Sequence, residues 1–377
     1  MRITTFIRLS PCAALVLAAA CNSDTTAPAT LSDPQATIAA VAALDSAFHS
    51  NALASFGALS GAIGSTKATA ALARAGSIVR ATLPRPTTPG VTAEAAAVRQ
   101  LSGLRALNLS PANPQGPVIN DTLYGSVYTY DTTFHAYVRS AATGGPANGI
   151  RFILYAINPI TGSLASPLTP VGQTDLLDES VGATAALHII VAGNGGTPTY
   201  LDYTAALTFS QTSLVATLTG SLTNALAGGA NKTLSFSVHA NFTVTTISVT
   251  GTYTLNNPAV TITLNASDRQ VVTTDSVTLS FGFTRQGEAI SFSGQLVTTA
   301  DVVDTVDAAI HVNGQPYASV RGNSLDVKFY DANGVEIVDT TQKHDILVAL
   351  QGIQFAVVVV ISFSAALLAP IVNLLNS

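Results

Sequence analysis

The sequence predicts an α+β fold: a large, curved, antiparallel β-meander, half-barrel-like, with N-terminal helices and a C-terminal apolar helix packed on its concave face. Three observations predict it. Apolar residues recur at helical spacing before residue 106, they alternate with polar residues over 118–340, and no Asp, Glu, Lys or Arg follows Asp345. Strands with one apolar face form a sheet that is wet on one side and covered on the other.

These changes of pattern along the sequence predict one domain over 33–377, made of a helical layer at 33–106, the sheet at 118–340 and the apolar helix at 343–376. The first helix starts at Asp33-Pro34, since Asp is a good N-cap and Pro fits the first turn. Apolar residues then recur every three or four positions at Ile38, Val41, Leu44 and Phe48.

The strand region is marked by strict alternation. Over 234–242 every second residue is apolar and the residues between are Ser, His or Asn, and 247–255, 260–264, 277–283 and 290–296 repeat the pattern. Short connections imply antiparallel neighbours. The turn sequence Asp331-Ala332-Asn333-Gly334, between alternating runs, predicts a hairpin.

The uncharged C-terminal segment has three interpretations. It is a helix buried against the sheet, a membrane-spanning helix, or a core strand built on the β-branched run 357–361. A spanning helix is disfavoured because no basic residue follows the apolar stretch and Pro370 interrupts it. The buried helix is therefore the interpretation adopted in the fold prediction.

The N-terminus predicts export. Arg2 and Arg8 precede an apolar stretch at 13–20, which is the layout of a secretory signal and too short to span a membrane. Cys21, preceded by Ala18-Ala19-Ala20, resembles the lipobox of bacterial lipoproteins, although Ala18 stands where that family usually has Leu. The resemblance implies cleavage of 1–20 and lipidation of Cys21. It covers only this segment and assigns no family to the mature domain.

The resemblance also implies a location. Acyl chains on Cys21 would anchor the protein to a membrane, and residues 22–32, rich in Thr, Ala and Pro, would form a flexible tether. Asn22 after the cysteine favours sorting to the outer membrane, so the protein is expected in the cell envelope, facing the periplasm or the cell surface. Because Cys12 lies in the signal, the mature chain would have no disulfide.

The composition argues against a nucleic-acid partner. Only 10% of residues are charged, against about 25% in typical proteins. Loss of Arg2 and Arg8 lowers Lys and Arg from 16 to 14 against 21 Asp and Glu, a formal net charge of −7. An acidic chain without a basic cluster lacks what phosphate backbones attract.

No motif indicates catalysis, a metal or a cofactor. The chain lacks a Gly-x-Ser-x-Gly elbow, a P-loop and a dinucleotide glycine motif, and none of its six histidines lies in a HExxH motif or a close pair. We predict that His239 and His311 face solvent on strands, that the acidic residues at 175–179 form a solvated loop, and that Asp301, Asp304 and Asp307 mark a turn and strand edge. The tyrosines at 124–137 are interpreted as strand packing rather than a sugar platform.

Two functions fit these patterns, and neither is enzymatic. In the first, sheet and apolar helix enclose a lipid or other hydrophobic ligand, as half-barrel lipoprotein carriers do; this is an analogy of architecture alone. In the second, the same apolar residues only fill the core of a structural or surface protein of the envelope. The residues predicted to line a ligand site are apolar and come from helix and sheet: Phe355, Val358, Phe363, Leu367, Phe236, Phe281 and Phe292.

Overall fold

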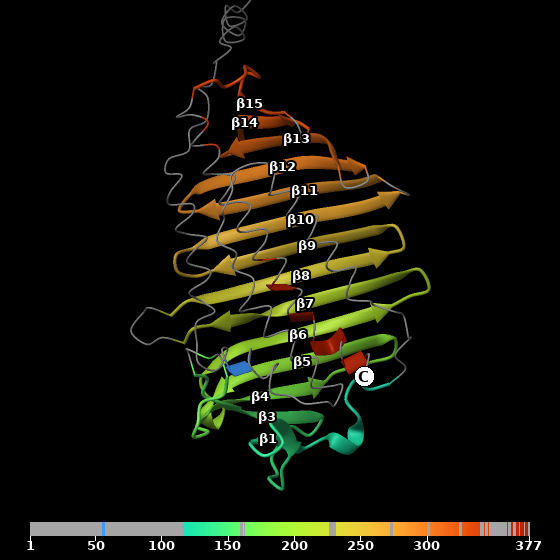
Figure 1. The fold of residues 1–377 in the computed structure, drawn as a ribbon, viewed down its shortest axis with the longest axis vertical. Coiled ribbons are helices and arrows are strands. Elements are labelled where there is room, and N and C mark those ends of the chain that lie inside the picture. Colours follow the sequence, from blue (N-terminus) through green and yellow to red (C-terminus); the bar gives the residue numbers. More distant parts are fainter. Residues whose placement is uncertain are drawn as a thin grey trace, which may run out of the picture.

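The described residues of this computed structural model form a single sheet of 15 strands, seen face-on in Figure 1. These residues are 55–56, 116–158, 161, 163–225, 231–271, 274–299, 302–323, 326–339 and single residues between 343 and 375. Two short 3-10 turns, η2 (Asp121–Leu123) and η3 (Asn194–Gly196), accompany the sheet. The strands are β1 (Ser126–Asp131), β2 (Ala136–Arg139), β3 (Gly149–Tyr155), β4 (Pro170–Asp178), β5 (Thr184–Gly193), β6 (Thr199–Phe209), β7 (Ser213–Thr223), β8 (Thr233–Thr243), β9 (Thr246–Leu255), β10 (Val260–Val271), β11 (Thr274–Arg285), β12 (Glu288–Thr299), β13 (Val302–Val312), β14 (Gln315–Gly322) and β15 (Val327–Asp331).

The strand order is simple except at one end. From β3 to β15 each strand pairs antiparallel with the next, whereas β1 lies between β2 and β3 and runs parallel to β3. The connection from β2 back to β3 passes very close to the start of β1. A Cβ at Gly145 would lie 2.6 Å from the Ser126 carbonyl oxygen, so only glycine fits this crossing.

Alternation decides which side chains form the core. In β8, Leu234, Phe236 and Val238 are buried while Ser235 and Ser237 are exposed, as the sequence pattern predicted. The pairing keeps this parity across the sheet, because the partners of Phe236 on β9 and then of each successive strand are the buried Tyr253, Ile262, Phe283 and Ile290. A one-residue slip would turn a whole strand inside out, so the apolar face fixes the register.

The predicted α+β class is wrong, because the described chain is nearly all β. Of the helical layer predicted at 33–106, only Ser55 and Phe56 are described, and the apolar helix predicted at 343–376 is represented only by single helical residues. The prediction gave too much weight to Ala-rich helical spacing, which is a weak signal. The period-two pattern from residue 118 onward instead builds 15 strands, and several of them, such as β8 and β9 or β11 and β12, are joined by turns of only two residues.

The axes of the strands are closely aligned over most of the sheet. In Figure 1, the axes of β4 to β13 are nearly aligned, with neighbouring strands antiparallel. Neighbouring strands usually rotate by about 20–25°, which would accumulate over ten strands. Such flat sheets are usually held by regular side-chain ladders, and the four pairings from β8 to β12 run without a register shift.

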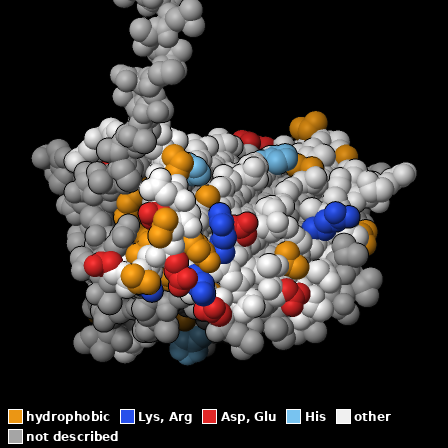
Figure 2. Space-filling view, turned by 90° about the horizontal axis from the view of Figure 1, so that it is seen from above, with side chains coloured by type: hydrophobic (Ala, Val, Ile, Leu, Met, Phe, Trp, Pro, Cys, Tyr) orange, Lys and Arg blue, Asp and Glu red, His pale blue; other side chains and the backbone are white. Residues whose placement is uncertain are grey.

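The β15 end of the sheet is closed by the chain itself. After the predicted turn at 331–334 the chain returns along β15, so that Asp331 N donates to Val335 O at 2.9 Å and Ile337 N donates to Phe329 O at 2.8 Å. Lys328 pairs with Glu336 at 3.3 Å across this return. Figure 2, which views the molecule from above, shows basic, acidic and hydrophobic side chains together on this end. Charges and an occupied edge both discourage pairing with another strand.

Candidate functional site

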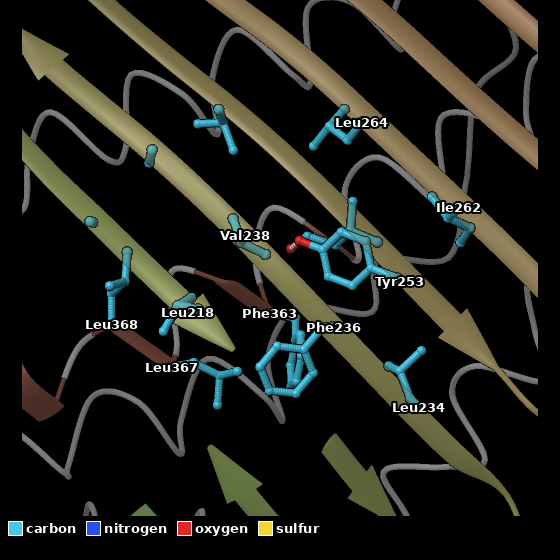
Figure 3. Close-up of a cluster of buried hydrophobic side chains, with 14 of the residues drawn as sticks. Leu218, Leu234, Phe236, Val238, Tyr253, Ile262, Leu264, Phe363, Leu367 and Leu368 are labelled. Atoms are coloured by element: carbon cyan, nitrogen blue, oxygen red, sulfur yellow. Dashed lines mark hydrogen bonds between the residues drawn. The ribbon is translucent and has the colours of Figure 1, made fainter. Parts of the chain in front are cut away.

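The predicted ligand-lining residues belong to a packed cluster. Phe236, Phe281 and Phe292 are buried on the inner face of the sheet, and Phe363 and Leu367 are buried helical residues near the C-terminus. Phe236 and Phe363 meet edge to face, with ring centroids 5.1 Å apart and planes at 89° (Figure 3). The remaining predicted residues, Phe355, Val358 and Cys21, lie outside the described residues.

The other two phenylalanines form a separate contact of the sheet. Phe281 on β11 and Phe292 on β12 are directly paired partners and are each 1% exposed. Gly294 makes room beside them, because a Cβ there would lie 3.1 Å from the Phe292 ring and 2.9 Å from the Ala308 Cβ. This small-beside-large arrangement is that of a filled core.

A hydroxyl relay ties the C-terminal residues to the middle of the sheet. The Ser364 hydroxyl donates to the Val360 carbonyl at 2.7 Å, and the Tyr253 hydroxyl lies 2.6 Å from Ser364 Oγ and 3.2 Å from the Val360 oxygen. A phenol and a serine hydroxyl have one proton each. Because the Ser364 hydroxyl donates its proton to the hydrogen bond with the Val360 carbonyl, Tyr253 is the donor to Ser364 Oγ. Each polar group of this buried relay then has a hydrogen-bond partner.

A second tyrosine makes the same kind of contact one turn of the segment away. Tyr203 on β6, fully buried, donates its hydroxyl to the Leu367 carbonyl at 3.2 Å. Its ring centroid lies 6.3 Å from that of Phe236, which in turn contacts Phe363. Sheet and C-terminal residues are therefore joined by two phenol hydrogen bonds and one aromatic pair, of which Figure 3 shows Tyr253, Phe236 and Phe363.

Glycines on the inner face make space for the tyrosines. A Cβ at Gly251 would lie 3.0 Å from the Tyr253 ring, and a Cβ at Gly220 would overlap the Tyr203 Cβ. Burial raises the pKa of Tyr203 and Tyr253 above the ordinary value of 10.0, because an apolar interior disfavours the phenolate. Both phenols therefore stay protonated and act as hydrogen-bond donors.

The contacting C-terminal residues share one helical stripe. Val360, Ser364, Leu367 and Ile371 are helical, buried and three or four residues apart, the spacing of one helix face. A residue that precedes the sheet also makes a buried hydrogen bond to it: the Ser55 hydroxyl donates to the Tyr155 carbonyl at 2.7 Å. Segments from before and after the sheet thus supply buried polar and apolar contacts to its inner face.

An ionic cluster occupies the opposite, outer face over β3 to β6. His188 lies between two carboxylates, with Nδ1 3.2 Å from Glu179 Oε1 and Nε2 2.7 Å from Asp202 Oδ1. Next to it, Arg151 forms a bidentate salt bridge with Asp175, from Nε to Oδ1 at 2.6 Å and from Nη2 to Oδ2 at 2.7 Å. Hydrogen bonding to Asp175 raises the pKa of Arg151 further above its ordinary value, so the guanidinium remains charged.

This cluster corrects the prediction of a solvated acidic loop at 175–179. Asp175 is part of β4, and Asp178, 9% exposed, accepts from Ile119 N at 2.6 Å and from Ser180 N at 3.0 Å. Each acidic residue thus has a specific partner. Because both nitrogens of His188 face carboxylates, neither is placed to activate a hydroxyl nucleophile. The cluster cross-links strands rather than forming a catalytic triad.

Other predicted positions are placed as follows. His239 is exposed on the outer face of β8, as predicted, and His311 on β13 is half-buried. Asp307 lies on β13 and pairs at its exposed surface with Arg321 at 3.6 Å, while Asp301 lies outside the described residues. The tyrosines of β1 and β2 pack as predicted, with Tyr128 stacked on Phe152 at 4.9 Å.

The rest of the outer face is rich in hydroxyls. Over β8 to β12 most of its exposed side chains are small and polar. We call the following set the hydroxyl face: Ser235, Ser237, His239, Thr250, Thr252, Thr254, Thr263, Asn265, Thr278, Ser280, Thr284, Ser291 and Ser293. It contains no Asp, Glu, Lys, Arg, Phe or Tyr. Of the charged residues on these strands, Arg269, toward the end of β10, is exposed, whereas Asp268, Arg285 and Glu288 are buried.

Neither a metal site nor a relative points to an activity. Within the described part of the chain, no three His, Cys, Asp or Glu side chains are grouped to hold a metal ion. No helix among the same residues is long and apolar enough to cross a membrane. No protein-family model, curated protein or solved structure matches the chain.

The sequence contained signals for part of what it missed. The tyrosines that hold the C-terminal residues stand at inward positions of alternating strands, where a phenol needs a buried acceptor. Gly251 stands two positions before Tyr253, and Leu255 stands two positions after it. Because all three face the same side of the strand, this spacing indicates an aromatic ring beside a glycine. The His188 cluster had no such signal, because Glu179, His188 and Asp202 meet only through strand register.

Proposed function

We propose that this chain is an exported, lipid-anchored protein of the outer membrane that acts as a non-enzymatic structural or surface protein of the cell envelope. The observation that carries the proposal is the relay from Tyr253 through Ser364 to Val360, together with the Phe236–Phe363 pair. These contacts support the proposal because they join predicted ligand-lining residues of the sheet and the C-terminal segment directly to one another.

A lipid or other hydrophobic ligand is the competing function. Such a ligand would have to separate Phe363 from Phe236 and break the bond from Tyr203 to the Leu367 carbonyl. Each buried group left without a partner costs about 1–3 kcal/mol. The ligand would have to offset that cost, whereas the unliganded chain already satisfies these groups.

Anchoring is tested by acylation. The full-length gene is expressed in a two-membrane bacterium as wild type, Cys21→Ser and Cys12→Ser, with labelled palmitate and membrane fractionation. We expect the wild type and the Cys12→Ser control to carry label and sediment with the outer membrane, and Cys21→Ser to lose both. Label that persists in Cys21→Ser would overturn the anchoring proposal.

The absence of a ligand is tested on the secreted Cys21→Ser chain. Native mass spectrometry and organic extraction are expected to give the mass of the polypeptide alone, together with cooperative unfolding in urea. A lipid recovered reproducibly in stoichiometric amount would instead support the carrier function. Its identity would then name the ligand class.

A further inference from the structure

We propose that the hydroxyl face binds the surface of ice, using the flat array of threonine and serine side chains on β8 to β12. The proposal concerns the face opposite the C-terminal cluster and does not depend on how the chain is anchored. Its basis is the regular spacing, the low twist and the neutrality of this face.

The spacing is regular in two directions. Along one row, Ser237, Thr252 and Thr263 are direct partners on β8, β9 and β10. The next row, two residues away, is formed by His239, Thr250, Asn265, Ser280 and Ser293 on five successive strands. Strands lie about 4.8 Å apart and like-facing residues about 6.8 Å apart along a strand, and repeats of this size also occur in the faces of hexagonal ice.

The array also continues across five strands without a break. None of the four pairings that join β8 to β12 contains a register shift, whereas the next pairing, β12 with β13, shifts between Val297 and Thr298. The axes of the strands of this region are nearly aligned in Figure 1, which indicates a low twist. An ordinary twist of about 20° per strand would lift the outer rows from any flat surface, so the low twist is what allows all rows to make contact together.

Threonine offers ice both parts of its side chain. The hydroxyl donates and accepts hydrogen bonds, as lattice water does, and the methyl group orders the water around it. Thr252 and Thr254 on β9 face Thr263 and Thr261 on β10, giving a block of four threonines in the middle of the face. Gly282 beside Thr263 leaves space for its hydroxyl, since a Cβ there would overlap Thr263 Oγ1.

Neutrality selects the partner. A face without Asp, Glu, Lys or Arg among its residues does not attract charged polymers and does not hold the tightly bound hydration shells of charged groups. Flat polysaccharide crystals are neutral as well, but sugar rings are usually bound by stacking on aromatic side chains, and the face has no Phe or Tyr. Ice meets the geometry and the neutrality without requiring aromatic side chains.

The test compares a blocked face with a matched control. The secreted chain with Cys21→Ser is assayed for inhibition of ice recrystallisation and for shaping of a single ice crystal. The blocked variant is Thr252→Tyr/Thr263→Tyr, which raises two rings above the middle of the face. The control is Thr212→Tyr, the same change at an exposed turn between β6 and β7, and circular dichroism checks that all three are folded.

We expect micromolar parent chain and Thr212→Tyr to inhibit recrystallisation, and the blocked variant to need at least about tenfold more protein because neighbouring rows lose contact. An inactive parent chain would overturn the proposal. Equal activity of the parent and the folded blocked variant would also overturn it. Binding to crystalline cellulose that is lost in the same variant, without any effect on ice, would assign the face to a polysaccharide instead.

Discussion

Replacing Phe363 by alanine should remove a large part of the stability that the C-terminal residues give to the sheet. The side chain is 7% exposed and meets Phe236 edge to face at 5.1 Å. Burial of a phenylalanine contributes about 1.5–3 kcal/mol, and an aromatic pair of this geometry adds about 1 kcal/mol. Because a cavity remains, we expect a loss of about 3–5 kcal/mol in the free energy of unfolding.

The assay is urea unfolding of the secreted chain, followed by far-ultraviolet circular dichroism. The control is Phe134→Ala, at a side chain that is 72% exposed in the turn after β1, where we expect a change within about 0.5 kcal/mol. A loss below about 1 kcal/mol for Phe363→Ala would refute the reasoning. It would mean that Phe363 does not pack in the core, and the argument against a bound ligand would lose its support.

Three further predictions concern the two faces of the sheet. Folding raises the pKa of Tyr203 and Tyr253 above 10.0, so in alkali the two phenols lose their protons when the chain unfolds. The free energy of unfolding should be constant below about pH 9 and fall above about pH 10 by up to about 1.4 kcal/mol per pH unit for each tyrosine. Urea titrations should show a shallower fall for Tyr253→Phe. Gly220→Ala should cost about 1–3 kcal/mol through overlap with Tyr203, measured by thermal melting, whereas the neighbouring Ser221→Ala should leave the melting temperature unchanged. Asp175→Asn should cost about 1–2 kcal/mol, because it leaves the half-buried Arg151 without its charged partner; an unchanged urea midpoint would show that this pair contributes nothing.

The strands were predictable because their pattern is repeated and physically simple. Each of β8 to β12 places apolar side chains at alternate positions, and two of the four turns between them, at 256–259 and 286–287, contain Asn, Gly or Pro. The hairpin turn at 331–334 was predicted for the same reason, and Gly334 has the positive φ of 79° that such a turn requires. Local chemistry was sufficient for these elements.

The fold class was not predictable in the same way. Ala-rich segments such as 33–48 have helical spacing. This spacing led to the prediction that helices form a second main component of the fold. The parallel placement of β1 beside β3 was also missed, because it depends on the crossing at Gly145 rather than on any repeated pattern. Sequence periodicity describes single elements, whereas strand order depends on how the connections pass.

The candidate sites differ from the strands because they depend on register. His188 meets Asp202 because it pairs with Thr204, which places Asp202 one like-facing position away on β6. Thr252 meets Thr263 by the same rule on β9 and β10. Alternation alone says that these side chains face outward, but not which of them are neighbours. The same register that buries Tyr253 against Ser364 also sets Thr252 in its outward row, so the inner contacts and the outward hydroxyl rows are two consequences of one strand pairing.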